Sequence, residues 1–285
     1  MCGLVGLYQK EGEALQRIFD GLIQVQHRGQ DAGGICTLQS SKINTHKELG
    51  LISEIFRNID INILKGNIGI GHVRYPTAGT DNVNEAQPFH TTNPINIALA
   101  HNGTLTNSDE IKTKLTKLNF CQFNTNSDSE VLLNLLSYEL FKTNKNEFSN
   151  TDILDVLKRI FNQCQGGYAV VALISGIGLV AFRDPNGIRP LALGKNHNGS
   201  YLLASESSAI TSLGFEVLKD VKPGEAIIIN LDGSVEEEHL IKDMQHTPCL
   251  FEYVYFSRPD STIDSISVHK SRLRMGDYLG EKIAT

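Results

Sequence analysis

The sequence lacks a long apolar run, a Cys-x-x-Cys pair and any excess of basic residues. A membrane-spanning helix needs about 20 predominantly apolar residues, and zinc ribbons and thioredoxin-like redox sites need closely spaced cysteines. The 26 Lys and Arg residues are outnumbered by 32 Asp and Glu residues, whereas proteins that bind nucleic acid usually carry a basic surface. The sequence therefore argues against a membrane span, a cysteine-pair site and a nucleic-acid partner.

Cysteine is also scarce, with five residues in 285 at wide spacings. Disulfide-rich scaffolds are typically small and secreted, and the start of the chain shows no basic region followed by an apolar run, as a signal peptide would. With 40% hydrophobic and 20% charged residues, the composition is that of an ordinary globular protein rather than a disordered one. We therefore expect a cytoplasmic protein with free thiols.

The hydrophobic pattern predicts a set of strands, then a group of helices, then strands again. Strands and helices would alternate in a parallel sheet, and they do not alternate here. Two antiparallel sheets covered by helices fit this order better, which is an α+β fold. Strands are predicted over 1–8, 33–38, 67–73, 95–100, 168–174, 178–183, 190–194, 200–205 and 225–230, and helices over 15–29, 107–118, 128–140, 151–164 and 271–284.

Cys2 directly follows the initiator methionine and precedes an apolar strand. Removal of Met1 would leave Cys2 with a thiol and a free α-amino group, whose ordinary pKa of about 7.7–8.0 lets it act as a base near neutral pH. A strand would hold this nucleophile more rigidly than a frayed end would. Taken alone, the sequence Met-Cys-Gly is explained better by an incidental cysteine at a disordered terminus than by a nucleophile. The catalytic interpretation of Cys2 therefore depends on the other motifs of the chain.

Four polar motifs accompany Cys2. They are HRGQD at 27–31, GHVRYPTAG at 71–79, HNGTLTN at 101–107 and TNSDSE at 125–130. Together with the N-terminal Met-Cys-Gly, they resemble the glutaminase domain of the class II, or N-terminal nucleophile (Ntn), glutamine amidotransferases. The resemblance implies the four-layer αββα sandwich of the Ntn hydrolase fold, built from two antiparallel sheets.

Three further segments narrow the resemblance: RDPNGIRP at 183–190, ASES at 204–207 and CLFEYVYFSRPDS at 249–261. They are similar to the class II members that pass the ammonia to phosphoribosylpyrophosphate. Those members make 5-phosphoribosylamine, the first step of de novo purine synthesis. The resemblance therefore implies a glycosyltransferase that takes its ammonia from glutamine, and it covers essentially the whole chain.

The resemblance implies a catalytic group of Cys2, Asn102 and Gly103. Cys2 would attack the side-chain amide of glutamine to give a thioester and ammonia, and water would then release glutamate. The tetrahedral intermediate carries an oxyanion that needs preorganised donors. The Asn102 side chain and the Gly103 N–H, which follow the predicted strand 95–100, would supply them. A plain Asn-Gly hairpin turn is the alternative.

The resemblance also implies a glutamine pocket. Arg74 would bind the α-carboxylate, for which a planar guanidinium is well suited, and Asp128 would bind the α-ammonium. Arg28 and Gly29 would line the pocket, and Thr77 belongs to a loop that would close over glutamine. Each assignment has a plainer alternative. Arg74 could form a surface ion pair, and Asp128 could complement a helix dipole. Arg28 and Gly29 could form an ordinary helix stop, and the loop with Thr77 could simply be exposed.

We expect no metal or cofactor in this chain. His27, His72 and His101 lack the spacing of a metal site and are expected to be hydrogen-bonded structural residues, because an N-terminal nucleophile supplies its own base. Cys249 matches one ligand of the iron–sulfur cluster of some relatives, but a cluster normally needs four thiolates. We therefore expect an ordinary buried thiol there, and Mg²⁺ only with a phosphoribosyltransferase domain.

Residues 2–250 are expected to form the glutaminase domain, and 251–285 to begin the connection to a phosphoribosyltransferase domain that this chain lacks. Such a domain holds pyrophosphate with an acidic, Gly/Thr-rich loop, and the sequence shows none. The expected partners are glutamine, that domain or a separate chain carrying it, and further copies of this chain.

Three other functions stay open. The chain could be the glutaminase domain of another class II amidotransferase, although segment 249–261 argues against it. It could be an N-terminal cysteine hydrolase of other amides, which the charged pair of Arg74 and Asp128 disfavours. It could also be a truncated, non-catalytic binding or remnant domain, but a drifting site would be expected to lose members of the set.

Overall fold

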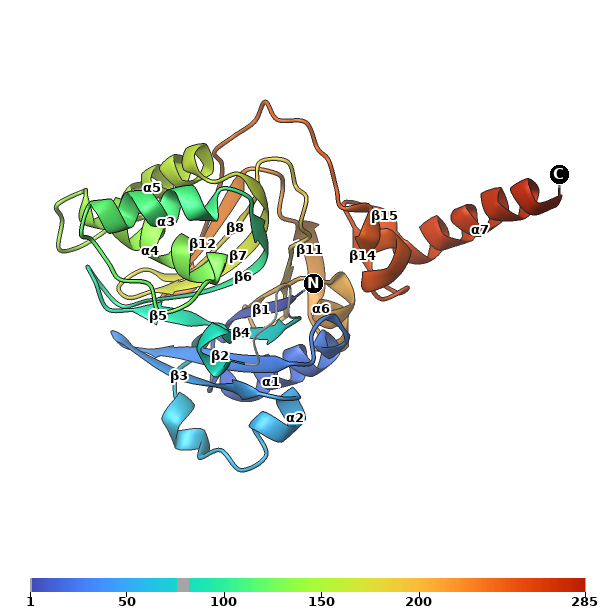
Figure 1. The fold of residues 1–285 in the computed structure, drawn as a ribbon. Helices are drawn as coiled ribbons and strands as arrows, with labels where there is room; N and C mark the ends of the chain where they lie inside the picture. Colours follow the sequence, from blue (N-terminus) through green and yellow to red (C-terminus); the bar gives the residue numbers. More distant parts are fainter. Residues whose placement is uncertain (1, 76–81, 285) are drawn as a thin grey trace.

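Two antiparallel sheets stack face to face, and helices cover both outer faces (Figure 1). The computed structural model describes residues 2–75 and 82–284. One apolar core lies between the sheets and another lies under each layer of helices. This order of layers confirms the predicted α+β fold and its αββα architecture.

The first sheet has seven strands in the order β11-β9-β10-β1-β4-β2-β3. Its central strand β1 is paired with β10 on one side and β4 on the other, so the backbone that follows Cys2 is fixed from both sides. The elements are β1 (Gly3–Tyr8), β2 (Ala32–Gln39), β3 (Lys42–Leu49), β4 (Ile68–Arg74), β9 (Ala192–Lys195), β10 (Tyr201–Ala204) and β11 (Glu216–Asp220), with α1 (Leu15–Gln24), the short turns η1 (Gln26–Arg28) and η2 (Ile61–Leu64), α2 (Ile52–Ile55) and α6 (Ser207–Ser212).

The second sheet has six strands in the order β13-β12-β8-β7-β6-β5. Three helices pack their apolar faces on its outer side. The elements are β5 (Phe89–Thr91), β6 (Ile97–Leu105), β7 (Gly166–Ile174), β8 (Gly178–Arg183), β12 (Glu225–Asn230) and β13 (Val235–His239), with the turn η3 (Val83–Glu85), α3 (Ser108–Lys117), α4 (Asp128–Phe141) and α5 (Asn150–Gln163).

Strand β1 contributes to two cores at once. Leu4 and Tyr8 point into the core between the sheets, whereas Val5 and Leu7 pack under the helices of the first sheet. This follows from strand geometry, because successive side chains face opposite sides. Both faces are buried, so the strand has a continuous apolar sequence rather than an alternating one.

In the two large sheets, the strands that the pattern missed are the four edge strands, β3, β5, β11 and β13. Their sequences carry many polar and charged residues, as in VEEEH of β13 and KINTHKEL of β3. Charged side chains on an edge discourage pairing with other chains. The same charges remove the apolar signal by which the inner strands were predicted.

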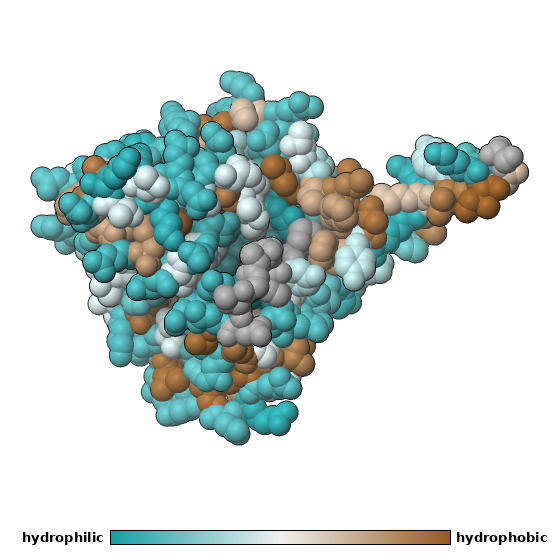
Figure 2. Space-filling model, viewed as in Figure 1, coloured by the Kyte–Doolittle hydropathy of each residue, from teal (hydrophilic) through white to brown (hydrophobic). Residues whose placement is uncertain are grey.

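The last part of the chain leaves the sandwich. It contains a π-helical turn η4 (Glu252–Phe256), the hairpin β14 (Thr262–Ile263) and β15 (Ile266–Ser267), and α7 (Val268–Ala284). Helix α7 projects away from the body (Figure 1), and apolar side chains are exposed on it (Figure 2). Among the described residues, no helix has both the length and the apolar character needed to cross a bilayer.

Candidate active site

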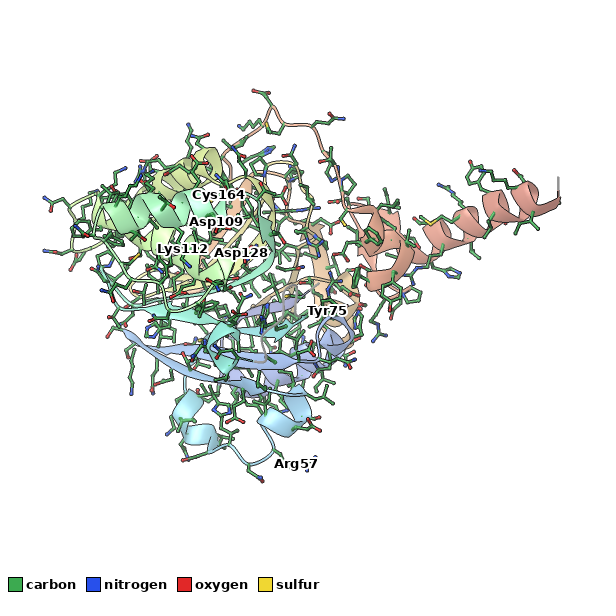
Figure 3. All side chains as sticks on the ribbon, in the orientation of Figure 1. Arg57, Tyr75, Asp109, Lys112, Asp128 and Cys164 are labelled. Atoms are coloured by element: carbon green, nitrogen blue, oxygen red, sulfur yellow. The ribbon has the colours of Figure 1, made fainter. Side chains whose placement is uncertain are left out.

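Cys2 borders a cavity of about 250 Å³ that gathers several of the predicted site residues. Arg74 ends β4 and is followed by Tyr75, and Asp128 begins α4. Figure 3 labels Tyr75 and Asp128, which lie near the middle of the view. Gly103 of β6 also lines this cavity. A thiol, a cation and an anion from distant parts of the sequence therefore meet at one small cavity.

Asn102 and Gly103 lie inside strand β6, which continues to Leu105. Their predicted position after a strand 95–100 was therefore wrong, and the hairpin-turn alternative is excluded. Gly103 has a φ of +149°, and a side-chain Cβ there would lie 2.0 Å from the carbonyl oxygen of Gly167. Only glycine fits this backbone. The sheet therefore fixes the peptide that would carry the Gly103 N–H.

The Asn102 side chain presents an unused donor. Its Oδ1 accepts a hydrogen bond from Arg189 Nη2 at 3.2 Å, and a guanidinium has donors only, so the amide oxygen must face it. The Asn102 Nδ2 is buried and has no hydrogen-bond partner among the described residues. Asn102, Arg189 and Cys2 line a second cavity, of about 390 Å³. A buried unpaired donor beside a thiol calls for an acceptor that binds there.

The charged residues of the first cavity are partly occupied. Arg74 Nη2 donates to the Glu85 carboxylate, and Glu85 also lines the cavity. Asp128 Oδ2 accepts the backbone N–H of Leu105 at 2.9 Å, and its Oδ1 lies 3.8 Å from His101 Nδ1. A free α-amino acid, which carries one charge of each sign, would find a partner for both in this cavity.

Arg28 does not line either cavity next to Cys2. Its side chain is fully buried, and its Nε donates to the carbonyl oxygen of Cys2 at 3.1 Å. Gly29 does not line either cavity, but it packs against the backbone of Arg74, because a Cβ on Gly29 would lie 2.4 Å from the Arg74 carbonyl carbon. The structure thus places Arg28 behind the nucleophile rather than in the pocket. Thr77 lies outside the described residues.

Burial governs ionisation around the nucleophile. It raises the pKa of the Cys2 thiol, so the thiol needs a base to become a nucleophile. Burial also lowers the pKa of His72 to about 3 and that of His101 below its ordinary value. Both imidazoles are therefore neutral near pH 7.

The comparisons with known proteins agree with this geometry. A family model described as a glutamine amidotransferase domain matches residues 72–212. The amidophosphoribosyltransferase of Pasteurella multocida is 48% identical over 288 residues, which cover 100% of this chain and 57% of that protein. The amidophosphoribosyltransferase of Escherichia coli is 47% identical over 289 residues, with the same coverage. The chain carries the glutamine amidotransferase domain of the amidophosphoribosyltransferase family.

Solved structures give the same assignment. One described as the allosteric regulatory enzyme of purine biosynthesis superposes with a TM-score of 0.87 at 37% identity, covering 99% of this chain and 58% of that one. The glutamine phosphoribosylpyrophosphate amidotransferase of B. subtilis, complexed with ADP and GMP, gives 0.81 at 37% identity, covering 94% and 55%. The chain thus spans somewhat more than half the length of the relatives it matches.

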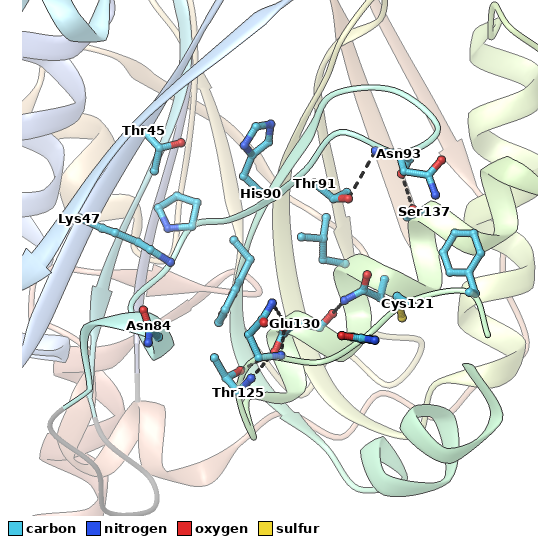
Figure 4. A pocket seen from close by; sticks show the side chains of 17 residues that line it. Thr45, Lys47, Asn84, His90, Thr91, Asn93, Cys121, Thr125, Glu130 and Ser137 are labelled. Atoms are coloured by element: carbon cyan, nitrogen blue, oxygen red, sulfur yellow. Dashed lines mark hydrogen bonds between the residues drawn. The ribbon is translucent and has the colours of Figure 1, made fainter. Parts of the chain in front are cut away.

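The chain also has a larger cleft, of about 710 Å³, that does not include Cys2 (Figure 4). Lys47 and Glu130 line it, but both are already engaged. Lys47 Nζ donates to the carbonyl oxygen of Ala86, and the Glu130 carboxylate accepts the backbone N–H groups of Asn124 and Thr125 at 2.9 and 2.8 Å. Size alone therefore does not identify the site.

Four charged residues near Cys2 were not predicted as site residues: Glu85, Arg189, Glu206 and Glu252. Three of them lie within the segments 183–190, 204–207 and 249–261, which had been used only to narrow the resemblance. Arg189 contacts Asn102, and Glu206 and Glu252 bind Arg28. Glu85 is the last residue of the turn η3 and accepts a hydrogen bond from Arg74. The sequence analysis therefore singled out the motifs that contain three of these residues, but it did not show that the residues lie near Cys2.

The residues weighed as metal ligands are dispersed. Across 2–75 and 82–284, no group of three or more His, Cys, Asp and Glu side chains could hold a metal ion. Cys249 is partly exposed, so its expected full burial was wrong. As expected, His27 and His101 are hydrogen-bonded: His27 Nε2 lies 2.8 Å from Glu206 Oε1, and His101 Nδ1 lies 3.1 Å from Ser129 Oγ. Both ring nitrogens of His72 are buried without a hydrogen-bond partner among the described residues, so the expectation was wrong for His72.

Proposed function

We propose that this chain hydrolyses glutamine to glutamate and ammonia through a thioester on Cys2. The observation that carries the proposal is the buried, unpartnered Nδ2 of Asn102, which is oriented by Arg189 next to the thiol. An oxyanion that forms as the thiol attacks an amide would accept from this donor and from the Gly103 N–H.

The proposed reaction begins with removal of Met1. The free α-amino group of Cys2 takes the thiol proton, and Sγ attacks the carbonyl carbon of the glutamine side chain. The protonated amine returns the proton to the leaving nitrogen, which departs as ammonia and leaves the thioester. Water, activated by the same amine, then cleaves the thioester and releases glutamate. The neutral His72 and His101 need no part in these steps.

Substrate recognition uses the first cavity. Arg74 binds the α-carboxylate of glutamine, which would replace or share the contact with Glu85, and Asp128 binds the α-ammonium. Gly29 lets the chain at Arg74 approach closely, and Thr77 belongs to the segment proposed to close over bound glutamine. A buried charge-assisted contact of this kind contributes about 1.5–3 kcal/mol.

In the whole protein, we propose that the ammonia reacts with phosphoribosylpyrophosphate to give 5-phosphoribosylamine. A phosphoribosyltransferase domain, which would bring its own Mg²⁺, would follow segment 251–285. The exposed apolar residues of α7, among them Leu273, Tyr278 and Ile283, support a covered surface there. A cytoplasmic homo-oligomer remains our expectation for that protein.

The test is an intact-mass spectrum before and after diazo-oxo-norleucine, a glutamine-like electrophile. We expect a mass that lacks Met1 and a single adduct, mapped to Cys2 by peptide analysis. The Cys2→Ser variant is the matched control and should take up no adduct. A folded chain that retains Met1, or a processed chain that gains no adduct, would contradict the proposal.

A further inference from the structure

We propose that Glu252 is a positioning residue of the glutaminase site: its carboxylate fixes two arginines, one on the backbone of Cys2 and one on the amide of Asn102. This inference deepens the proposed function and rests on it. Glu252 lies in η4, outside both sheets of the sandwich. A residue from the connecting segment would therefore set the geometry of the nucleophile and of the oxyanion donor together.

The first arm runs through Arg28. Its Nη2 donates to both carboxylate oxygens of Glu252, at 2.7 and 2.9 Å, and its Nε donates to the carbonyl oxygen of Cys2 at 3.1 Å. A guanidinium is planar and rigid, so contacts at its two ends are geometrically linked. Glu206 accepts from the other terminal nitrogen, Nη1, at 2.5 Å, so the Glu252 and Glu206 carboxylates together set where Arg28 holds Cys2.

The second arm runs through Arg189. Its Nη2 donates to Glu252 Oε1 at 3.0 Å and to Asn102 Oδ1 at 3.2 Å. One nitrogen thus serves the carboxylate and the amide oxygen. This contact keeps the amide oxygen turned toward Arg189 and leaves Nδ2 free as a donor. Without Glu252, Arg189 would lose the partner that holds it against Asn102.

Burial makes this network sensitive to the loss of one member. Arg28, Glu206 and Glu252 are at most 1% exposed, and Arg189 is 6% exposed, so two cations and two anions balance out of contact with water. Burial alone would raise the pKa of Glu252, but the charges of Arg28 and Arg189 lower it. The carboxylate therefore stays ionised, and removing it would leave an uncompensated buried charge.

Contacts outside the sandwich hold Glu252 in place. Ser257 Oγ donates to Glu252 Oε2 at 2.8 Å. Arg272 of α7 donates from Nε to the carbonyl oxygen of Tyr253 at 2.9 Å and from Nη2 to that of Ser257 at 2.7 Å. A displacement of the η4 turn would consequently reach Cys2 and Asn102 through two buried ion pairs.

The experiment compares Glu252→Gln with Asp260→Asn in the full chain. Both changes remove one negative charge from the same segment, but Asp260 pairs with Arg258 at the surface and its side chain is 55% exposed. We expect Glu252→Gln to lower kcat for glutamine hydrolysis about 10- to 100-fold with KM changed less than about threefold, since small misplacements of reacting groups cost rate. Asp260→Asn should retain both constants.

A double variant separates positioning from general damage. If Glu252 acts through Asn102, Glu252→Gln should cost less in the Asn102→Ala background than in the wild type, because residues that act as a unit are not additive. Should Glu252→Gln fail to fold, Ser257→Ala removes the hydrogen bond to its carboxylate together with a long contact of 3.5 Å from Arg28 Nη1, and it leaves every charge in place. A fall in kcat of about threefold, with KM retained, is then expected.

The outcomes are distinguishable. Wild-type kcat in a folded Glu252→Gln chain, a change in KM alone, or losses that multiply in the double variant would overturn the inference and leave the proposed function intact. If Glu252→Gln does not fold, a wild-type kcat in the Ser257→Ala chain would likewise overturn the inference and leave the proposed function intact. A wild-type chain without glutamine hydrolysis would overturn the proposed function and this inference with it.

Discussion

The larger cleft and the cavities next to Cys2 differ in how their polar groups are satisfied. The larger cleft is lined by groups that are bonded to one another, as Glu130 is to the backbone of Asn124 and Thr125. The smaller cavities next to Cys2 hold groups that lack partners, above all the Asn102 Nδ2. An unpaired buried donor is expensive unless a ligand uses it. Unmet hydrogen-bonding capacity, rather than volume, therefore marks the functional site.

The largest expected difference concerns the two partly exposed cysteines that face these hollows. Cys2→Ala should abolish glutamine hydrolysis, a fall in kcat of at least about 10⁴-fold, because a nucleophile cannot be replaced by its neighbours. Cys121→Ala in the larger cleft should retain full activity. Steady-state glutamate release measures both. If the Cys121 variant lost activity at an unchanged melting temperature, the larger cleft would be part of the functional site, contrary to this comparison.

The next difference concerns two asparagines. Asn102→Ala removes the oxyanion donor and should lower kcat about 10²- to 10³-fold with little change in KM. Asn134→Ala removes a side chain that donates to the Glu130 carbonyl oxygen in the larger cleft, and should leave kcat unchanged. Single-turnover release of ammonia is the measurement. Equal losses in the two variants would argue against an oxyanion role for Asn102.

Two carboxylates of α4 provide a smaller contrast, since Asp128 faces the site and Glu130 faces the larger cleft. Asp128→Asn should raise KM for glutamine about 10- to 100-fold, because it removes the charge opposite the α-ammonium. Glu130→Gln should lower the melting temperature and leave KM unchanged, since it weakens four hydrogen bonds within the protein. An unaltered KM in the Asp128 variant would reject its proposed role.

The smallest difference is in the pH dependence of stability. His72 has a pKa of about 3 in the folded chain but about 6.5 when unfolded. The unfolded state therefore binds more protons below pH 6.5, and stability is lost progressively between 6.5 and 3, at about 1.4 kcal/mol per pH unit. His72→Leu should flatten this slope in denaturant titrations between pH 6.5 and 5. The control is His90→Gln, which changes the more exposed histidine of the larger cleft. It should leave most of the slope of stability against pH unchanged.

The inner part of the fold could be predicted from the sequence, and its edges could not. Strands such as β1 and β7 are buried on both faces, so their apolar runs are unmistakable. All four edge strands were missed, because the polar residues on their exposed faces give them a composition similar to that of loops. The helices α3, α4 and α5 were predicted within a few residues of their observed bounds, since apolar spacing and capping residues are local signals.

The site was only partly accessible to sequence reasoning. Cys2, Arg74, Gly103 and Asp128 were predicted together and meet at one cavity. The buried pairing of Arg28 with Glu252 joins residues 224 positions apart, and no local pattern encodes it. Such long-range electrostatic partners become visible only when the fold is known.

The location of Asn102 within a strand has a mechanical consequence. Strand β6 is paired with β7 from Ile97 to Leu105, so Asn102 has no loop freedom, and its backbone can shift only if the ladder shifts with it. Backbone that is held in a strand ladder opens less often than the ends of a chain do. On heating, the Asn102 donor should thus keep its position after the ends of the chain have unfolded. It should be lost only when the sandwich itself unfolds.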